Sequence, residues 1–179
     1  MADAAGLLDD AGRIVRALGR IGLDPILVGG MALVTIGSRR VTRDFDFVIA
    51  HPGDQLETLV ELFYDAGLEL AARVNSTGEI TAAIGNRRVA AARLHIDAPA
   101  TAYFCNPTTG LRIDLLFDFP IPAAALAEHA TRVTIRSVTF QVASEADLLR
   151  LKKIARAQRS APGDAEDIAF LEARRSHKA

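Results

Sequence analysis

The spacing of hydrophobic and polar residues changes several times along the N-terminal part of the chain. From Asp3 to about Gly19, apolar side chains recur at helical spacing, as they do along an amphipathic helix. The uninterrupted apolar run over 25–28 instead predicts a short buried strand. Further along, the pattern predicts, in order, a brief helix over 31–36, a basic loop over 38–42, a strand over 43–49 and an amphipathic helix over 54–65.

The pattern is weaker between residues 68 and 99 and becomes clear again beyond them. In this stretch it favours a short strand near Leu70, a helix over 80–84 and a strand within 89–96. Ser144 marks a later helix start, because a serine with an acidic residue three positions on forms a capping pair. The remaining predicted elements are strands over 103–105 and 111–117, a hairpin over 132–135 and 139–142, and helices over 144–158 and 164–174.

Helices at both ends of the chain, with short strands between them, predict an α+β fold in which a short mixed sheet is flanked by helices. The length of 179 residues suits one domain. We therefore expect 1–179 to form a single domain, with 144–179 as a C-terminal helical part packed on it.

Two aspartates lie on one face of the predicted strand over 43–49. Side chains two apart on a strand point the same way, so Asp44 and Asp46 stand side by side while Phe45 and Phe47 face the other way. Like charges held this close repel, and at least one carboxylate resists ionising unless a positive charge lies between them. The pair therefore predicts a divalent-cation site.

Two further features fit such a site. Gly29 and Gly30 end a strand and open a helix, where backbone amides can approach an anion closely because glycine has no Cβ. Asp114 lies in mid-strand on the polar face of 111–117, whereas two competitors for the role of third carboxylate, Asp118 and Asp97, lie close to prolines. Phosphoryl transfer needs this combination of a phosphate cradle and carboxylates that hold hard cations.

This ordered set resembles the signature of the nucleotidyltransferase superfamily. The run GGMALVTIGSRRVTRDFDF holds the two glycines and the D-x-D pair in the family's order, and RIDLLF holds the later aspartate. It is most similar to AbiEii-like and related minimal nucleotidyltransferases, many of which are toxins of toxin–antitoxin pairs. The C-terminal segments of that group, D-L-x-x-x-K and D-x-x-D-[IL], are matched here by Asp147, Leu148 and Lys152, and by Asp164, Asp167 and Ile168.

The resemblance implies a polymerase-β-like fold and the transfer of a nucleoside monophosphate from an NTP to a hydroxyl acceptor. Mg²⁺ or Mn²⁺ would be bound by the catalytic residues Asp44, Asp46 and Asp114, and Asp114 could also take the proton of the acceptor. The nucleotide would be held by Gly29, Gly30, Arg40 and Lys152. The acceptor is left open among tRNA or other RNA, a protein and a small molecule, and an antitoxin protein is a further expected partner.

Some of these residues also have a structural interpretation. Lys152 borders the apolar stripe of the helix over 144–158, so its amine either reaches the nucleotide or stays wet while its stem packs. Lys153 lies about 100° further round the helix and is expected in solvent. Asp164 and Asp167 are expected to cap the last helix and to pair with a basic group.

Composition excludes several classes of protein. The formal net charge of -1 argues against a strongly basic nucleic-acid coat protein. Cys105 is the only cysteine, so neither an intrachain disulfide nor a cysteine zinc cluster can form. The lack of a roughly 18-residue apolar run and of a basic secretory leader makes the cytoplasm the expected location, with no membrane partner. The rival to an enzyme is a non-catalytic module of the same fold that binds nucleotide or protein.

Overall fold

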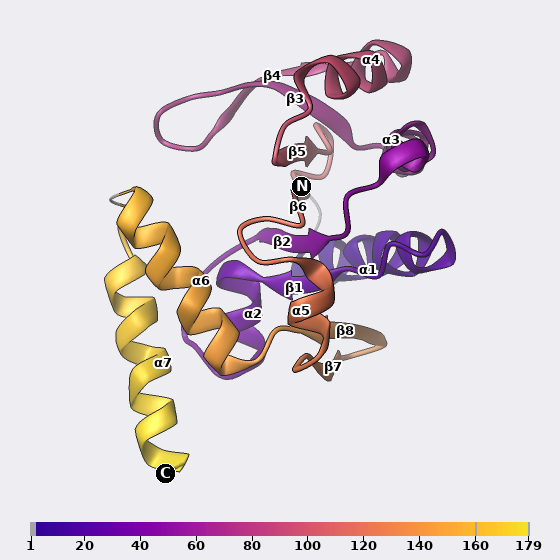
Figure 1. The fold of residues 1–179 in the computed structure, drawn as a ribbon. Helices are drawn as coiled ribbons and strands as arrows, with labels where there is room; N and C mark the ends of the chain where they lie inside the picture. Colours follow the sequence, from indigo (N-terminus) through magenta and orange to yellow (C-terminus); the bar gives the residue numbers. More distant parts are fainter. Residues whose placement is uncertain (1–2, 160, 179) are drawn as a thin grey trace.

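The computed structural model describes residues 3–159 and 161–178 and consists of a mixed sheet with helices on both faces (Figure 1). The strands are β1 (Ile26–Val28), β2 (Asp44–Ile49), β3 (Glu69–Val74), β4 (Ile80–Ile84), β5 (Thr101–Cys105), β6 (Arg112–Phe117), β7 (Thr131–Ile135) and β8 (Val138–Val142). The helices are α1 (Ala4–Arg20), α2 (Gly29–Thr35), the 3₁₀ helix η1 (Gly53–Gln55), α3 (Leu56–Asp65), α4 (Arg87–Asp97), α5 (Ala123–Ala127), α6 (Glu145–Gln158) and α7 (Asp164–Lys178). This arrangement confirms the predicted α+β fold with a mixed sheet flanked by helices.

Within the described residues, eight strands form one sheet in the order β4-β3-β5-β6-β2-β1-β8-β7. The pairs β1–β8 and β2–β6 are parallel, and the other neighbours are antiparallel. The order places β2 beside β6 in the middle of the sheet, although β3, β4, β5 and two α-helices separate them in sequence. The strands that carry the three candidate aspartates are therefore neighbours.

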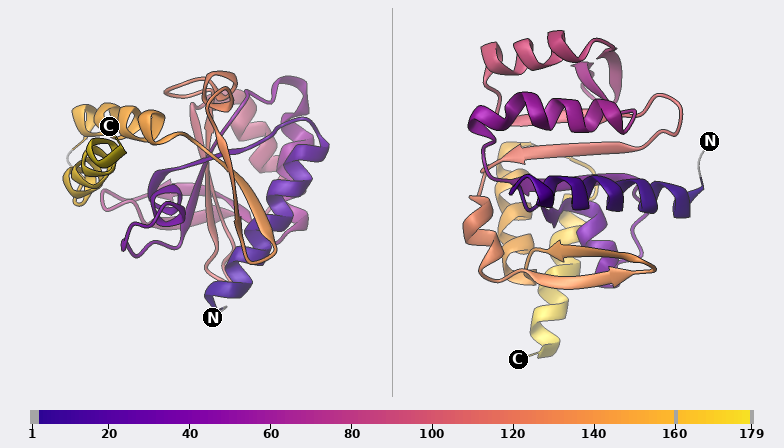
Figure 2. Two further views of the ribbon diagram at one scale, coloured as in Figure 1. Left: turned by 90° about the horizontal axis from the view of Figure 1, so that it is seen from below. Right: turned by 90° about the vertical axis from the view of Figure 1, so that its right-hand side faces the viewer.

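The helices divide between the two faces of the sheet. Helices α1, α3 and α4 cover one face, and they stand in front of the strands in the right-hand view of Figure 2. Helices α2, α6 and α7 lie on the opposite side, where the β3–β4 hairpin also extends away from the edge of the sheet (Figure 1). The hairpin and the α6–α7 pair thus flank the middle strands on one face.

Aromatic rings from strands β2 and β8 stack together in the core. Phe45 and Phe47 are 1% and 0% exposed, so the face of β2 opposite the two aspartates is buried. Both rings stack with Phe140, at centroid distances of 6.0 and 6.3 Å.

Helix α1 begins at Asp3, whose side chain accepts a 2.7 Å hydrogen bond from the amide of Gly6. No helix in the described part of the chain is both long and apolar enough to cross a membrane.

Two expectations for the weakly patterned stretch are wrong. Residues Ile80–Ile84, predicted as a helix, form strand β4, and 89–96, predicted as a strand, lie inside helix α4. Strand β4 buries no residue, so no hydrophobic period marks it. Helix α4 buries only Ala90, Ala91 and Leu94, and it begins at Asn86, whose side chain accepts hydrogen bonds from two following amides. The short helix α5 is an element that the pattern does not predict.

Candidate active site

A cleft of about 670 Å³ opens on the face of the sheet that carries α2 and α6. Its floor is formed by β2, β5 and β6, and its rim by the start of α2, one side of α6 and the tip of the β3–β4 hairpin. The structure brings the sequence-predicted site residues to this one cleft, whose lining includes Gly29, Gly30, Arg40, Asp44, Asp46, Asp114 and Lys152.

The parallel pairing of β2 with β6 sets the positions of the aspartates. In this register Asp46 is the partner of Asp114, and Asp44 is the partner of Arg112. Residues at paired positions project on the same face of the sheet, so the three carboxylates share the floor of the cleft. Asp114 is buried, and the two β2 aspartates are half-buried.

The carboxylates are short of neutralising charge. Burial, together with the charges of Asp114 and Asp44, raises the pKa of Asp46 from 3.8 to about 7. Burial also raises the pKa of Asp114, even though Arg112 acts in the opposite direction. A site with this electrostatic balance favours either a bound proton or a bound cation.

Arg112 is the basic residue that binds the third aspartate. Its Nε donates to Asp114 Oδ1 at 2.7 Å and its Nη2 donates to Asp114 Oδ2 at 2.9 Å, which is the two-pronged geometry that a guanidinium makes with a carboxylate. Its Nη1 donates to the backbone carbonyl of Gly78 at the hairpin tip. The guanidinium carbon also lies 5.2 Å from the centre of the Tyr103 ring.

The two competing aspartates have structural partners elsewhere. Asp118 accepts hydrogen bonds from the amides of His51 and Ala123 at 3.0 and 2.9 Å. Asp97 forms an exposed ion pair with Arg93 on helix α4. Neither lines the cleft, so Asp114 is the candidate that the fold places beside the D-x-D pair.

Gly29 fits against Asp46 without room for a side chain. Its φ of +69° lies in the left-handed region that favours glycine, and a Cβ built on it would lie 2.1 Å from Asp46 Oδ2. Val28, just before it, is the register partner of Asp46 across β1 and β2. The glycine turn and the D-x-D pair therefore form one packed unit.

Gly29→Ala should weaken Mg²⁺–NTP binding about tenfold, because the new methyl group must push the Asp46 carboxylate from its place. The matched control is Gly22→Ala, where φ is +79° and nothing lies within 4 Å of the built Cβ. Both variants should lose about 1–2 kcal/mol of unfolding free energy from backbone strain. Calorimetric titration and melting curves of both would contradict this account if Gly22→Ala weakened binding as much.

Lys152 is buried in a cluster of charges between α6 and α7. Its Nζ lies 2.7 Å from Asp167 Oδ2 and 3.2 Å from Asp164 Oδ1, and Asp167 also accepts a hydrogen bond from Arg40. The other oxygen of Asp164, Oδ2, is buried without a hydrogen-bond partner among the described residues and lies 3.8 Å from Arg159 Nε. The expected pairing of Asp164 and Asp167 with a basic group is thus present, and Lys152 does not extend into solvent.

Lys153 behaves as its helical position predicts. Its side chain is 56% exposed and pairs with Glu172 at 2.9 Å. The side chain of Lys152, one residue earlier, is 11% exposed and lines the cleft, and its positive charge opposes the rise in the pKa of Asp46. The adjacent lysines therefore differ in both burial and electrostatic reach.

The donor set of the cleft fits a hard divalent cation in its chemistry, because carboxylate oxygens are the ligands that Mg²⁺ and Mn²⁺ prefer. The raised pKa values of Asp46 and Asp114 agree with a need for positive charge. Within the described residues, no three His, Cys, Asp or Glu side chains are grouped so that they could hold an ion as they stand. Asp114 is engaged by Arg112 instead.

Sequence reasoning missed the part of the cleft on the other side of the carboxylates. Arg112, Tyr103 and the hairpin residues Thr77 and Gly78 all line it. Arg112 shares the strand face of Asp114 by parity, and this was a usable signal. The hairpin tip left no such signal, because its contact with Arg112 joins segments far apart in the chain.

No protein-family model matches the sequence, and no curated protein matches it. Three solved structures are similar in fold. The lincosamide antibiotic adenylyltransferase LnuA, with lincomycin bound, has a TM-score of 0.57 and 12% identity, covering 92% of this chain and 95% of that chain. The antibiotic-resistance factor ANT(2'')-Ia has a TM-score of 0.56 and 13% identity, covering 98% of this chain and 94% of that chain.

The third structure is an antigenic nucleotidyltransferase-like protein from Paracoccidioides brasiliensis, with a TM-score of 0.57 and 17% identity, covering 92% of this chain and 74% of that chain. At such low identities the likeness concerns the arrangement of helices and strands. It agrees with the fold that the glycine, D-x-D and later aspartate motifs imply. The chain has the nucleotidyltransferase fold.

Proposed function

We propose that this protein transfers a nucleoside monophosphate from an NTP to a hydroxyl acceptor with the help of a divalent cation. The observation that carries the proposal is the charge balance on the floor of the cleft. Asp44, Asp46 and Asp114 come from two neighbouring parallel strands and share one face, and burial and mutual repulsion raise the pKa of Asp46 to about 7. A cation beside Asp46 would favour its ionised form and lower its pKa from this raised value.

Each residue of the cleft has a role in this proposal. Asp44, Asp46 and Asp114 would hold Mg²⁺ or Mn²⁺, which neutralises the phosphates and the charge that develops on the attacking and leaving oxygens. Gly29 and Gly30 would let the phosphates approach the backbone, and Arg40 and Lys152 would face them as cations. The raised pKa of Asp114 suits a group that accepts the proton of the acceptor hydroxyl. Pyrophosphate would leave.

The acceptor and the biological role rest on other grounds. RNA or tRNA, a protein, and a small molecule are the acceptor classes under test. The lincosamide antibiotic adenylyltransferase of similar fold, with lincomycin bound, makes a small molecule a necessary arm of the test. The role of a toxin with an antitoxin protein as its partner rests on the similarity of the motifs to AbiEii-like proteins.

Mg²⁺ should strengthen NTP binding at least about tenfold, because in its absence the phosphates meet carboxylates of the same charge on the floor of the cleft. The measurement is calorimetric titration of each NTP at pH 8, where Asp46 is ionised, with Mg²⁺ or with EDTA. Equal affinity under the two conditions would remove the cation from the proposal.

A second experiment separates an enzyme from a binding module. Each labelled NTP is incubated with Mg²⁺ and with total RNA, total protein or lincomycin, and the acquisition of label is followed. Label in any one fraction identifies the acceptor class. Metal-dependent NTP binding with no label in any fraction would favour the non-catalytic module.

A further inference from the structure

Arg112 joins the candidate third cation ligand to the hairpin above it. Both oxygens of Asp114 accept from its guanidinium, at 2.7 and 2.9 Å, and the remaining nitrogen donates to the carbonyl of Gly78. The Arg112 side chain is only 18% exposed, and Tyr103 lies against it. All the nitrogens of the guanidinium therefore bind either the carboxylate or the hairpin tip.

The hairpin has few other attachments beyond its base. We call residues 71–83 the arm. Strand β3 pairs with β5 only at Glu69 and Leu70, and its pairing with β4 shifts register twice within Ala71–Val74. Every residue of the arm is exposed or half-buried. Asn75 closes the tip on itself, because its side chain accepts from Thr77 and Glu79 amides, so the tip can move as one piece.

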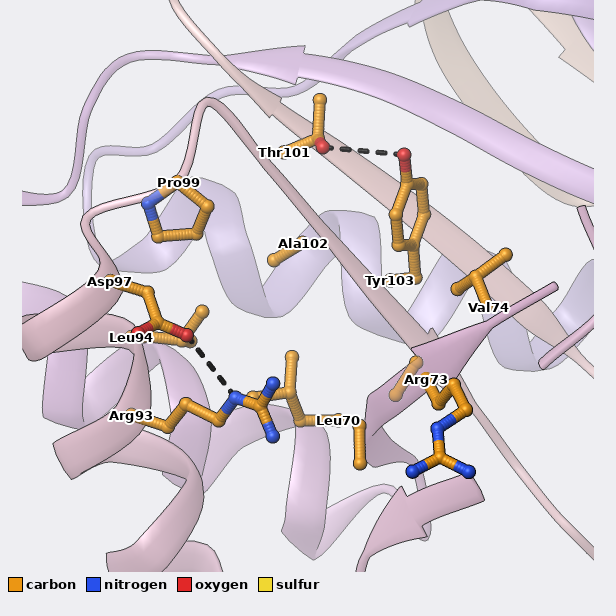
Figure 3. A pocket seen from close by; sticks show the side chains of 12 residues that line it. Leu70, Arg73, Val74, Arg93, Leu94, Asp97, Pro99, Thr101, Ala102 and Tyr103 are labelled. Atoms are coloured by element: carbon orange, nitrogen blue, oxygen red, sulfur yellow. Dashed lines mark hydrogen bonds and ion pairs between the residues drawn. The ribbon is translucent and has the colours of Figure 1, made fainter. Parts of the chain in front are cut away.

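A cavity of about 200 Å³ lies behind the arm, where β3 separates from β5 and leaves space below α4. Figure 3 shows this cavity, with Tyr103 of β5 near Val74 of the arm on one side and Asp97 and Pro99 on the other. Beyond Leu70 the arm makes no strand pairing with β5. Its attachment to the floor of the cleft is made at the tip, through Arg112.

A bound dication and the guanidinium cannot both lie on Asp114 without strong repulsion at that distance. We propose that Arg112 is a positioning residue that holds Asp114 and the tip of the arm while the cleft has no cation, and that it gives up the carboxylate when the cation binds, which releases the arm. The proposal rests on the cation site of the proposed function. It assigns to Arg112 a role in controlling metal entry and the opening of this side of the cleft.

The first test uses Mn²⁺ alone as the probe, with binding to the full chain followed by electron paramagnetic resonance at pH 8. Removing the competing charge in Arg112→Gln should tighten Mn²⁺ binding about tenfold. The matched control is Arg87→Gln, which breaks an exposed ion pair with Asp65 and should leave the affinity unchanged. Arg112→Lys keeps the charge but loses the two-pronged contact, so its affinity should fall between those of the wild type and Arg112→Gln.

The second test follows the arm itself. The sequence has no tryptophan, so Ser76→Trp places a single fluorophore on the exposed tip. Its emission should change when Mg²⁺ is added. In Ser76→Trp with Arg112→Gln or Arg112→Lys, the metal-free spectrum should already resemble the Mg²⁺-bound one.

The outcomes distinguish this proposal from the proposed function. If neither wild type nor variants bind Mn²⁺, the cation site itself is wrong, and this proposal falls with it. If the wild type binds Mn²⁺ and both Arg112 variants bind it equally well or more weakly, Arg112 supports the ligand instead of competing for it. That result would overturn the proposal and leave the cation site standing. So would a Ser76→Trp emission spectrum that changes neither on addition of Mg²⁺ nor on substitution of Arg112.

Discussion

Asp46→Asn should lower the rate of nucleotidyl transfer by at least about 100-fold, which is the scale of losing one group that stabilises charge in a transition state. The substitution keeps the size of the side chain and removes a charge from the middle of the carboxylate set. The rate is measured as label transferred to whichever acceptor the wild type modifies. Asp97→Asn is the matched control, because Asp97 is an exposed partner of Arg93 outside the cleft, and its rate should not change.

The same variant should be more stable than the wild type in the absence of metal, and increasingly so as the pH rises. The pKa of Asp46 is 3.8 in its ordinary state and about 7 in the fold, so the folded protein binds this proton more tightly. The stability that the proton contributes is complete below pH 3.8 and is lost as the pH rises through 7. Asparagine cannot lose a proton, so the difference in melting temperature should grow between pH 4 and pH 8 in EDTA.

An Asp46→Asn protein that labels its acceptor as fast as the wild type would leave only the non-catalytic module. A melting-temperature difference that stays constant with pH would show instead that Asp46 is not the group short of positive charge. The two measurements fail independently, because the first concerns the cation-loaded cleft and the second the metal-free one.

Local patterning was sufficient for the elements with one buried face. Strand β2 alternates because Phe45 and Phe47 enter the core and Asp44 and Asp46 do not, and the same parity places Asp114 on the polar face of β6. The predictions for residues 80–84 and 89–96 were wrong because these elements lack such a buried apolar face. Strand β4 buries nothing, and helix α4 buries mainly alanines, so neither carries a hydrophobic period that identifies it.

Pairing between distant segments is the part that one sequence does not reveal. That β6 lies next to β2, and that Arg112 reaches the hairpin tip, depends on the order of strands in the sheet. The sequence predicts that Asp164 and Asp167 pair with a basic group, but it does not show which residue that is. The structure shows that it is Lys152, because α7 packs against α6.

Lys152→Met should destabilise the fold by about 3–5 kcal/mol, because it removes the cation from a buried cluster and leaves the carboxylates of Asp164 and Asp167 short of charge. Methionine keeps the length of the stem, so packing is largely preserved. Lys153→Met breaks only an exposed pair with Glu172 and should cost less than about 1 kcal/mol. Urea unfolding of the two variants gives both values.

The position of Lys152 in the cleft makes a second expectation separable from the first. If its amine also binds the phosphates, NTP affinity should fall about ten- to a hundredfold, the equivalent of one charge-assisted hydrogen bond of about 1.5–3 kcal/mol. The double variant Lys152→Met with Asp164→Asn removes one charge of each sign, so it should recover part of the lost stability and none of the lost affinity. Recovery of both would mean that Lys152 only holds α6 to α7, and the phosphates would then be left to the glycine turn, Arg40 and the cation.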